Sequence, residues 1–168
     1  MIDEFSFKEF ELSDKVKEKL KNKKWLKKEL SSGKTAQEIL GYSNEVVAKF
    51  YEAAIHLFER ELYVDASNAF LFLVTLNPRN YEFWLGLGMC TQMCGKFEDA
   101  IDAYEMAAIC EVNSPVPYFY MAKCLFAVND HDNAIRALDL ALEFSENQSE
   151  FFDLRQQALK ARDLLLSE

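Results

Sequence analysis

Cysteine and histidine are the residues of this 168-residue chain best suited to metal binding or nucleophilic chemistry. Cys90 and Cys94 are one helical turn apart, but zinc needs two more ligands, usually from a further Cys or His cluster. The only histidines, His56 and His131, lie elsewhere in the chain. We therefore interpret all four cysteines as reduced thiols that pack as small apolar side chains, and we expect no metal and no other cofactor. They are Cys90, Cys94, Cys110 and Cys124.

Catalytic motifs are also missing from the sequence. It contains no paired carboxylates, no Ser/His/Asp set and no phosphate-binding glycine loop, so we do not expect an enzyme. Half of the residues are apolar, with only 3 prolines and 5 glycines, which indicates a globular, helix-rich chain. No apolar run approaches the roughly 18 residues that a membrane span needs. Because residues 1–5 are acidic rather than basic, we expect no secretory signal and a cytoplasmic protein.

The charge of the chain is unevenly distributed. Residues 1–34 carry 10 lysines and 7 acidic residues, whereas residues 35–168 carry 9 basic and 21 acidic residues. An acidic body repels phosphate backbones, so nucleic acid is not an expected partner. The lysine run of residues 15–28 could serve an anionic membrane or nucleic acid. We favour the other interpretation, a solvated helix face whose apolar side packs on something else, such as a second copy of the chain.

The sequence contains a 34-residue repeat, which determines where the cysteines, histidines and charged residues lie. Phe50, Trp84 and Tyr118 are spaced by 34 residues. Further positions recur at the same step, among them Ala54/Gly88/Ala122, Tyr63/Phe97/His131, Ala66/Ala100/Ala134 and Phe70/Tyr104/Leu138. This period and pattern are typical of the tetratricopeptide repeat (TPR), a helix-turn-helix unit. Gly88 and Ala100 are small because the two helices of a unit should cross closely there.

The sequence thus predicts an all-α fold of three tandem TPR units that form a right-handed superhelical groove. We expect N-terminal helices and an arm in residues 1–42, repeats in residues 43–146 (about 47–80, 81–114 and 115–148), and a capping helix in residues 147–168. The expected arm is residues 1–12. The expected helices span about 13–30, 36–40, 44–60, 64–77, 80–94, 97–112, 117–128, 131–144 and 148–166.

The first helix of each unit has positions that do not pack within the unit, and in a TPR superhelix these positions line the concave surface. We predict that they form a peptide-binding groove. The residues are Tyr51, Ile55, Phe58, Leu85, Met89, Gln92, Phe119, Lys123 and Phe126. Since Lys123 is the only cation among them, the groove lacks the Lys/Asn/Arg clamp with which some TPR adaptors grip a C-terminal carboxylate. The alternative is that the apolar stripe of the first repeat packs under the N-terminal helices.

The expected helix of residues 13–30 carries an imperfect apolar stripe. Leu20, Trp25, Leu26 and Leu30 belong to it, and we predict that these four residues form a dimer contact.

The middle repeat, Phe83-Trp84-Leu85-Gly86-Leu87-Gly88-Met89-Cys90 followed by Gly95-Lys96-Phe97, resembles the class II chaperones of bacterial type III secretion. Residues 114–117 (Ser-Pro-Val-Pro), residues 122–125 (Ala-Lys-Cys-Leu) and the junction at residues 33–35 (Gly-Lys-Thr) extend the similarity. The resemblance covers roughly residues 25–160.

This resemblance implies a small, acidic, cytoplasmic and non-enzymatic chaperone of hydrophobic translocator proteins. Such chaperones hold an extended client segment in the concave TPR face, keep the client soluble for secretion, and often dimerise through N-terminal helices. Tyr51, Ile55 and Phe58 match aromatic and apolar groove residues of the family. The alternative function is a TPR adaptor or scaffold subunit of another bacterial assembly.

Overall fold

The structure, a computed structural model, describes residues 11–167, and these contain helices and no strand. The predicted arm, residues 1–12, lies outside the described residues except for its last two. The helices are α1 (Asp14–Lys21), α2 (Lys23–Ser31), α3 (Ala36–Leu40), α4 (Asn44–Glu59), α5 (Tyr63–Leu76), α6 (Tyr81–Met93), α7 (Phe97–Cys110), α8 (Pro115–Ala127), α9 (His131–Phe144), the short 3₁₀ turn η2 (Ser149–Phe151) and α10 (Phe152–Ser167).

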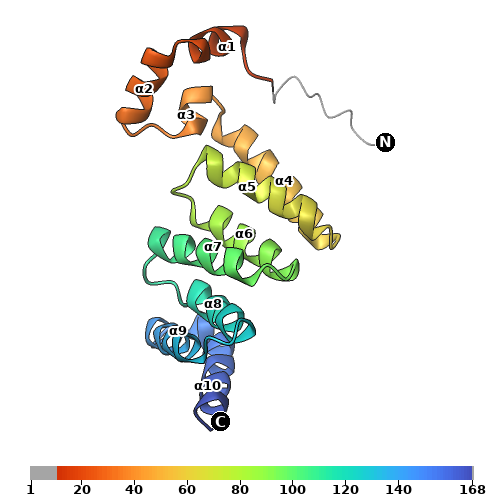
Figure 1. Cartoon of the computed structure of the whole chain (residues 1–168), viewed down its shortest axis with the longest axis vertical. Helices are drawn as coiled ribbons and strands as arrows, with labels where there is room; N and C mark the ends of the chain where they lie inside the picture. The colour runs from red at the N-terminus through yellow and green to blue at the C-terminus, as the bar shows by residue number, and fades with distance from the viewer. Residues whose placement is uncertain (1–10, 168) are drawn as a thin grey trace.

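Helices α4 to α9 form three helical hairpins that stack in chain order, α4 with α5, α6 with α7, and α8 with α9 (Figure 1). The helix bounds fall within three residues of those predicted. The larger of the two early starts has a physical reason: α8 begins at Pro115, two residues before the prediction, because a proline in the first helical turn has no N–H that would need a partner. The predicted all-α hairpin architecture is confirmed.

The turn inside each hairpin repeats as strictly as the sequence. Glu61, Gly95 and Asn129 lie 34 residues apart, and all three have left-handed backbones, with φ of 60°, 73° and 63°. Each residue allows the next N–H to bond back to a carbonyl in the last helical turn, which satisfies groups that helix ends otherwise leave unpaired. These bonds join Leu62 to Leu57 (3.0 Å), Lys96 to Thr91 (2.9 Å) and Asp130 to Leu125 (2.9 Å).

Close helix crossings determine where small residues are required. A Cβ added at Gly88 would lie 2.6 Å from the ring of Tyr104 on the paired helix α7, as predicted from the repeat pattern. A Cβ added at Gly86 would lie only 2.2 Å from the ring of Phe70 on α5. Gly86 therefore admits an aromatic ring from the preceding repeat. The first role was predicted from the sequence, whereas the second was not.

The predicted single helix of residues 13–30 is wrong, because it is broken at Asn22 into α1 and α2. Asn22 is extended (φ −86°, ψ 93°), and its side-chain oxygen accepts a hydrogen bond from the Trp25 N–H at 3.0 Å. Asparagine competes well for helix ends, since its side chain replaces a missing backbone partner. The short helix α3 forms as predicted, with a reciprocal cap between Thr35 and Glu38 and with Gly41 at its end.

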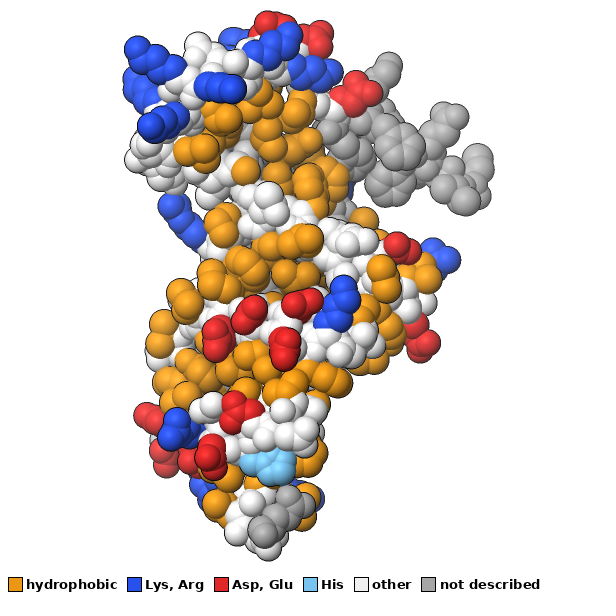
Figure 2. Space-filling model, viewed as in Figure 1, with side chains coloured by type: hydrophobic (Ala, Val, Ile, Leu, Met, Phe, Trp, Pro, Cys, Tyr) orange, Lys and Arg blue, Asp and Glu red, His pale blue; other side chains and the backbone are white. Residues whose placement is uncertain are grey.

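Helix α10 packs along α9 and covers the end of the stack. Ala158 is fully buried there, Arg155 donates to the Leu142 carbonyl at 2.7 Å, and Arg162 pairs with Asp139 at 3.2 Å. Figure 2 shows basic side chains gathered over α1 and α2 and acidic ones over the second and third hairpins. This distribution follows the charge asymmetry of the sequence.

Glu61 offers a test of the turn geometry. A left-handed backbone costs a non-glycine residue about 1–2 kcal/mol. Glycine avoids this cost, but part of the gain in stability is offset because glycine loses more conformational freedom on folding. Glu61→Gly should therefore raise the free energy of unfolding by about 0.5–1 kcal/mol in urea denaturation followed by circular dichroism. The matched change Gly95→Ala should lower it by about 1 kcal/mol. A loss of stability in Glu61→Gly would contradict the assigned geometry.

Candidate binding groove

The three predicted groove residues of α4 lie at the edge of the core cluster of the first two hairpins, which contains Phe70 and Phe83. Tyr51 packs edge-on against Phe70, with ring centroids 6.0 Å apart, and against Phe83 of the next hairpin at 5.7 Å. Burial, with the nearby charge of Glu82, raises the pKa of the Tyr51 hydroxyl. Ile55 and Phe58 are also half-buried against this cluster. Their remaining surfaces form an apolar, partly aromatic stripe.

In the second hairpin the predicted residues lie on α6. Leu85 and Met89 are half-buried and pack against the core cluster of the last two hairpins, which contains Tyr104 and Leu138. The Gln92 side-chain oxygen accepts a hydrogen bond from the Tyr104 hydroxyl at 2.7 Å, and burial raises the pKa of that hydroxyl. Gln92 therefore holds α6 to α7. Its amide nitrogen remains the polar group that it can offer to a ligand.

In the third hairpin, the predicted residues of α8 come together at a cavity of about 460 Å³ between α8 and α10. The Lys123 ammonium nitrogen lies 4.4 Å from the centroid of the buried Phe119 ring and 5.1 Å from that of Tyr120. Burial lowers the pKa of Lys123. Phe126 is 47% exposed and stacks on His131 at 5.1 Å.

Residues of α10 also line this cavity, which sequence reasoning missed. They are Gln157, Lys160, Ala161, Leu164 and Leu165. The sequence predicts α10 only as a capping helix. The signal in the sequence was the run Leu164-Leu165-Leu166. Three consecutive leucines give the helix more apolar surface than contact with one neighbouring helix requires.

The N-terminal helices do not pack over this face. Within residues 11–167, α1 and α2 contact each other, bury none of their residues and make no extensive contact with α4, α6 or α8. The segment is tied to the repeats near its end, where Arg79 donates to the Gly33 carbonyl at 2.9 Å. Within the described residues, α1 and α2 therefore do not cover the α4 stripe, contrary to the alternative given above.

The residues predicted to form a dimer contact lie on α1 and α2. Leu20, Trp25 and Leu26 are half-buried, Leu30 is 55% exposed, and the Lys19 ammonium lies 5.5 Å from the Trp25 ring centroid. Within residues 11–167, the apolar stripe of these amphipathic helices makes no extensive contact with α4, α6 or α8.

The cysteines divide into two kinds. Cys90 and Cys124 occupy equivalent core positions and are fully buried, which raises their thiol pKa values to about 12 and about 11. Cys94 and Cys110 are half-buried. In the part of the chain that the structure describes, no group of three or more His, Cys, Asp or Glu residues is placed to hold a metal ion.

Stacked helical hairpins with an apolar face on their first helices define the class as a TPR-type repeat protein with a groove. No family model matches the chain. It is 30% identical over 125 residues to low calcium response locus protein H of Yersinia pestis, and the alignment covers 74% of each chain. The chain belongs to this family, the class II chaperones of type III secretion, which are not enzymes.

Solved structures of a Yersinia enterocolitica relative, the type III secretion chaperone SycD, have the same fold. SycD in complex with a peptide of the translocator YopD is 28% identical, with a TM-score of 0.72, over 73% of this chain and 94% of that one. The alternative dimer of SycD is 29% identical, with a TM-score of 0.71, over 73% and 93%. The predicted family and repeat fold are confirmed. Within residues 11–167, no helix is long and apolar enough to cross a membrane.

Burial of the thiols predicts their reactivity. Because the thiolate is the reactive form, and full burial shields it, Cys94 and Cys110 should be alkylated far faster than Cys90 and Cys124 at neutral pH. Cys94 should react faster than Cys110, because burial raises the pKa of Cys110. Mass spectrometry of the folded chain after timed alkylation measures this. Concentrated guanidinium chloride, as the control, should bring the four rates together. Equal rates in the folded chain would contradict the packing of the two buried cysteines.

Proposed function

We propose that this chain is a bacterial cytoplasmic chaperone that holds an extended, apolar segment of hydrophobic translocator proteins in its concave groove. The observation that carries the proposal is the apolar, partly exposed face on α4, α6 and α8, which α1 and α2 leave open. The YopD peptide bound to the relative SycD supports the same class of client. The chaperone would keep the translocators soluble and competent for secretion.

The physical basis is the chemistry of the client. A protein with membrane-inserting segments exposes large apolar patches in water and aggregates unless they are covered. A few buried anchors can supply most of the binding energy of such a complex, while the rest of the surface excludes water. An extended segment that becomes ordered on binding pays an entropic cost, which keeps the complex reversible for release at secretion.

The groove that we propose consists of the nine residues predicted from the sequence. The aromatic and aliphatic members would receive apolar anchors of the client. Tyr51 and Gln92 have a second, structural task, because they link helices within the chaperone. Phe58 and Phe126 each contact one ring at the start of the following helix, Tyr63 at 5.3 Å and His131 at 5.1 Å, so a binding test at these two residues needs a control for the fold.

We also propose that the client-free chain is a homodimer that buries the stripe of Leu20, Trp25, Leu26 and Leu30. Within the described residues, the stripe makes no extensive contact with a helix other than α1 and α2. Removal of this apolar surface from water in a second copy would contribute about 25 cal/mol for each Å² buried. A dimer of the relative SycD is consistent with the proposal.

The double change Phe58→Ser and Phe126→Ser tests the groove. Each change removes an aromatic anchor from the proposed client contact, so capture of a co-expressed translocator protein should fall at least about tenfold. The helical circular dichroism should not change. Leu71→Ser on α5, where the leucine is 54% exposed, is the matched control and should bind as the wild type does. Undiminished capture by the double variant would refute the groove.

Leu20→Asp combined with Leu26→Asp tests the dimer. A carboxylate in a buried apolar contact is costly, so the variant should have the mass of a monomer in light scattering at concentrations where the wild type has the mass of a dimer. Lys24→Asp, on the solvated side, should leave the mass unchanged. If the double variant retains the dimer mass, another surface forms the contact.

A further inference from the structure

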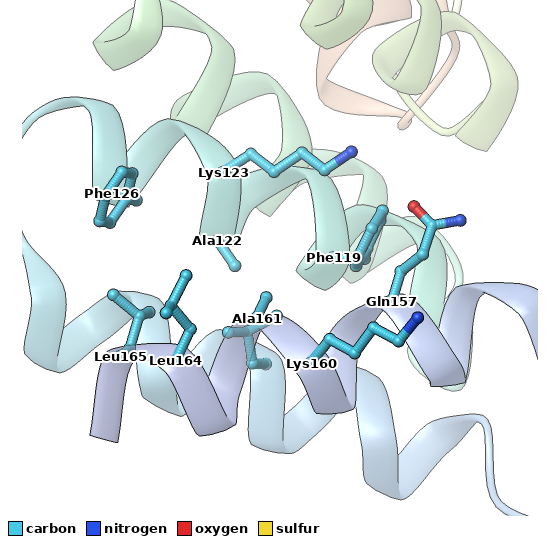
Figure 3. A pocket seen from close by; sticks show the side chains of 10 residues that line it. Phe119, Ala122, Lys123, Phe126, Gln157, Lys160, Ala161, Leu164 and Leu165 are labelled. Carbon is cyan, nitrogen blue, oxygen red and sulfur yellow. The ribbon is translucent and has the colours of Figure 1, made fainter. Parts of the chain in front are cut away.

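The cavity between α8 and α10 has two chemically different ends (Figure 3). At one end lie the apolar side chains of Phe126, Leu164 and Leu165. At the other end the amine groups of Lys123 and Lys160 lie toward the amide of Gln157, beside the Phe119 ring. Helical spacing explains this order, because residues 157, 160, 161, 164 and 165 follow one face of α10 from the polar end to the apolar end.

Within the part of the chain that the structure describes, the cations at the polar end have no carboxylate partner. Among the ion pairs of residues 11–167, none includes Lys123 or Lys160. Asp163, one turn after Lys160, lies 3.7 Å from Arg162 instead. Lys123 lies over two aromatic rings, which attract a cation more weakly than a desolvated carboxylate does. The partial burial that lowers the pKa of Lys123 also favours a bound anion beside it.

Two lysines at one cavity are notable in this part of the molecule, since residues 35–168 carry 21 acidic and only 9 basic residues. A negatively charged segment approaching such a surface is repelled almost everywhere. At this cavity it would be attracted. Charge complementarity therefore identifies the chemistry that the cavity fits, an apolar side chain with a carboxylate close to it.

We propose that this cavity is the C-terminal subsite of the groove and binds a large apolar side chain of the translocator segment together with a neighbouring Asp or Glu. The inference rests on the proposed function, and it adds α10 and a sequence preference to it. The apolar anchor lies among Phe126, Leu164 and Leu165, and the carboxylate accepts hydrogen bonds from Lys123 and Lys160. Because Phe119, Lys123 and Phe126 line both the cavity and the proposed groove, the two are continuous.

The size of the cavity agrees with a side-chain anchor. A volume of about 460 Å³ is in the range of small-ligand pockets, so it accommodates one or two large side chains. A whole helix of a second chaperone copy would need a long open face instead. The basic helices α1 and α2 of a second copy would also be repelled by Lys123 and Lys160.

The test uses short overlapping peptides that span the translocator proteins of the same organism, with binding to the full-length chain measured by fluorescence anisotropy. Peptides in which Asp or Glu lies near a large apolar residue should bind Lys160→Glu roughly tenfold more weakly than they bind the wild type. Their Asp→Asn or Glu→Gln versions should bind both proteins equally. Arg136→Glu, an equal change of charge on α9, should have no such effect. Replacing the peptide's acid with lysine should restore binding to Lys160→Glu.

The other possible results separate failure of the subsite from failure of the groove. If Lys160→Glu weakens acidic and amide peptides equally, or weakens neither, the subsite is wrong while the groove stands, provided that Phe58→Ser with Phe126→Ser still loses binding. If no peptide binds the wild type, both this inference and the proposed function fail. If Lys160→Glu changes only the mass of the client-free chain, the occupant is a second copy and the proposal is wrong.

Discussion

The close approach of paired helices at small residues is the constraint on which the rest of this structure depends. Gly88 lies against the Tyr104 ring with no room for a Cβ, and the equivalent residues Ala54 and Ala122 are almost fully buried. Because packed interiors tolerate little extra volume, these sites determine how near the two helices of each hairpin lie. The repetition of this crossing every 34 residues makes three similar hairpins. The left-handed turn residues then let each chain reversal occur in the same way.

The proposed groove follows from this packing. Each first helix uses one side for its crossing, which leaves another side for contacts outside the hairpin. On α4 and α8 that second side is apolar and aromatic, and α10 extends it beyond the last repeat. A chaperone of the translocator class needs such a surface, since it must cover apolar segments without performing any reaction on them. The acidic body and the two lysines at the α10 end would then give the groove a direction.

Much of this could be predicted from the sequence, because the repeat signal comes from packing contacts that recur at a fixed spacing. The bounds of α4 to α9, the role of Gly88 and the family were all accessible in this way. The break at Asn22 was not, because the apolar stripe continues across it, and a local side-chain cap overrides the weak periodicity. The left-handed Glu61 was also hidden, since glutamate has no preference for that conformation, and only the equivalence with Gly95 reveals it. The contribution of α10 depends on a tertiary contact between distant segments, which no local pattern specifies.

Hydrogen–deuterium exchange of the chaperone, alone and with a co-purified translocator protein, tests the central claim most directly. Amides exchange through local opening, and a client that rests on one face suppresses the opening of the helices beneath it. We expect slower exchange in α4, α6, α8 and α10 in the complex, with little change in α5, α7 and α9. Protection confined to the second helices of the hairpins, or spread equally over both faces, would contradict a client held in the concave groove.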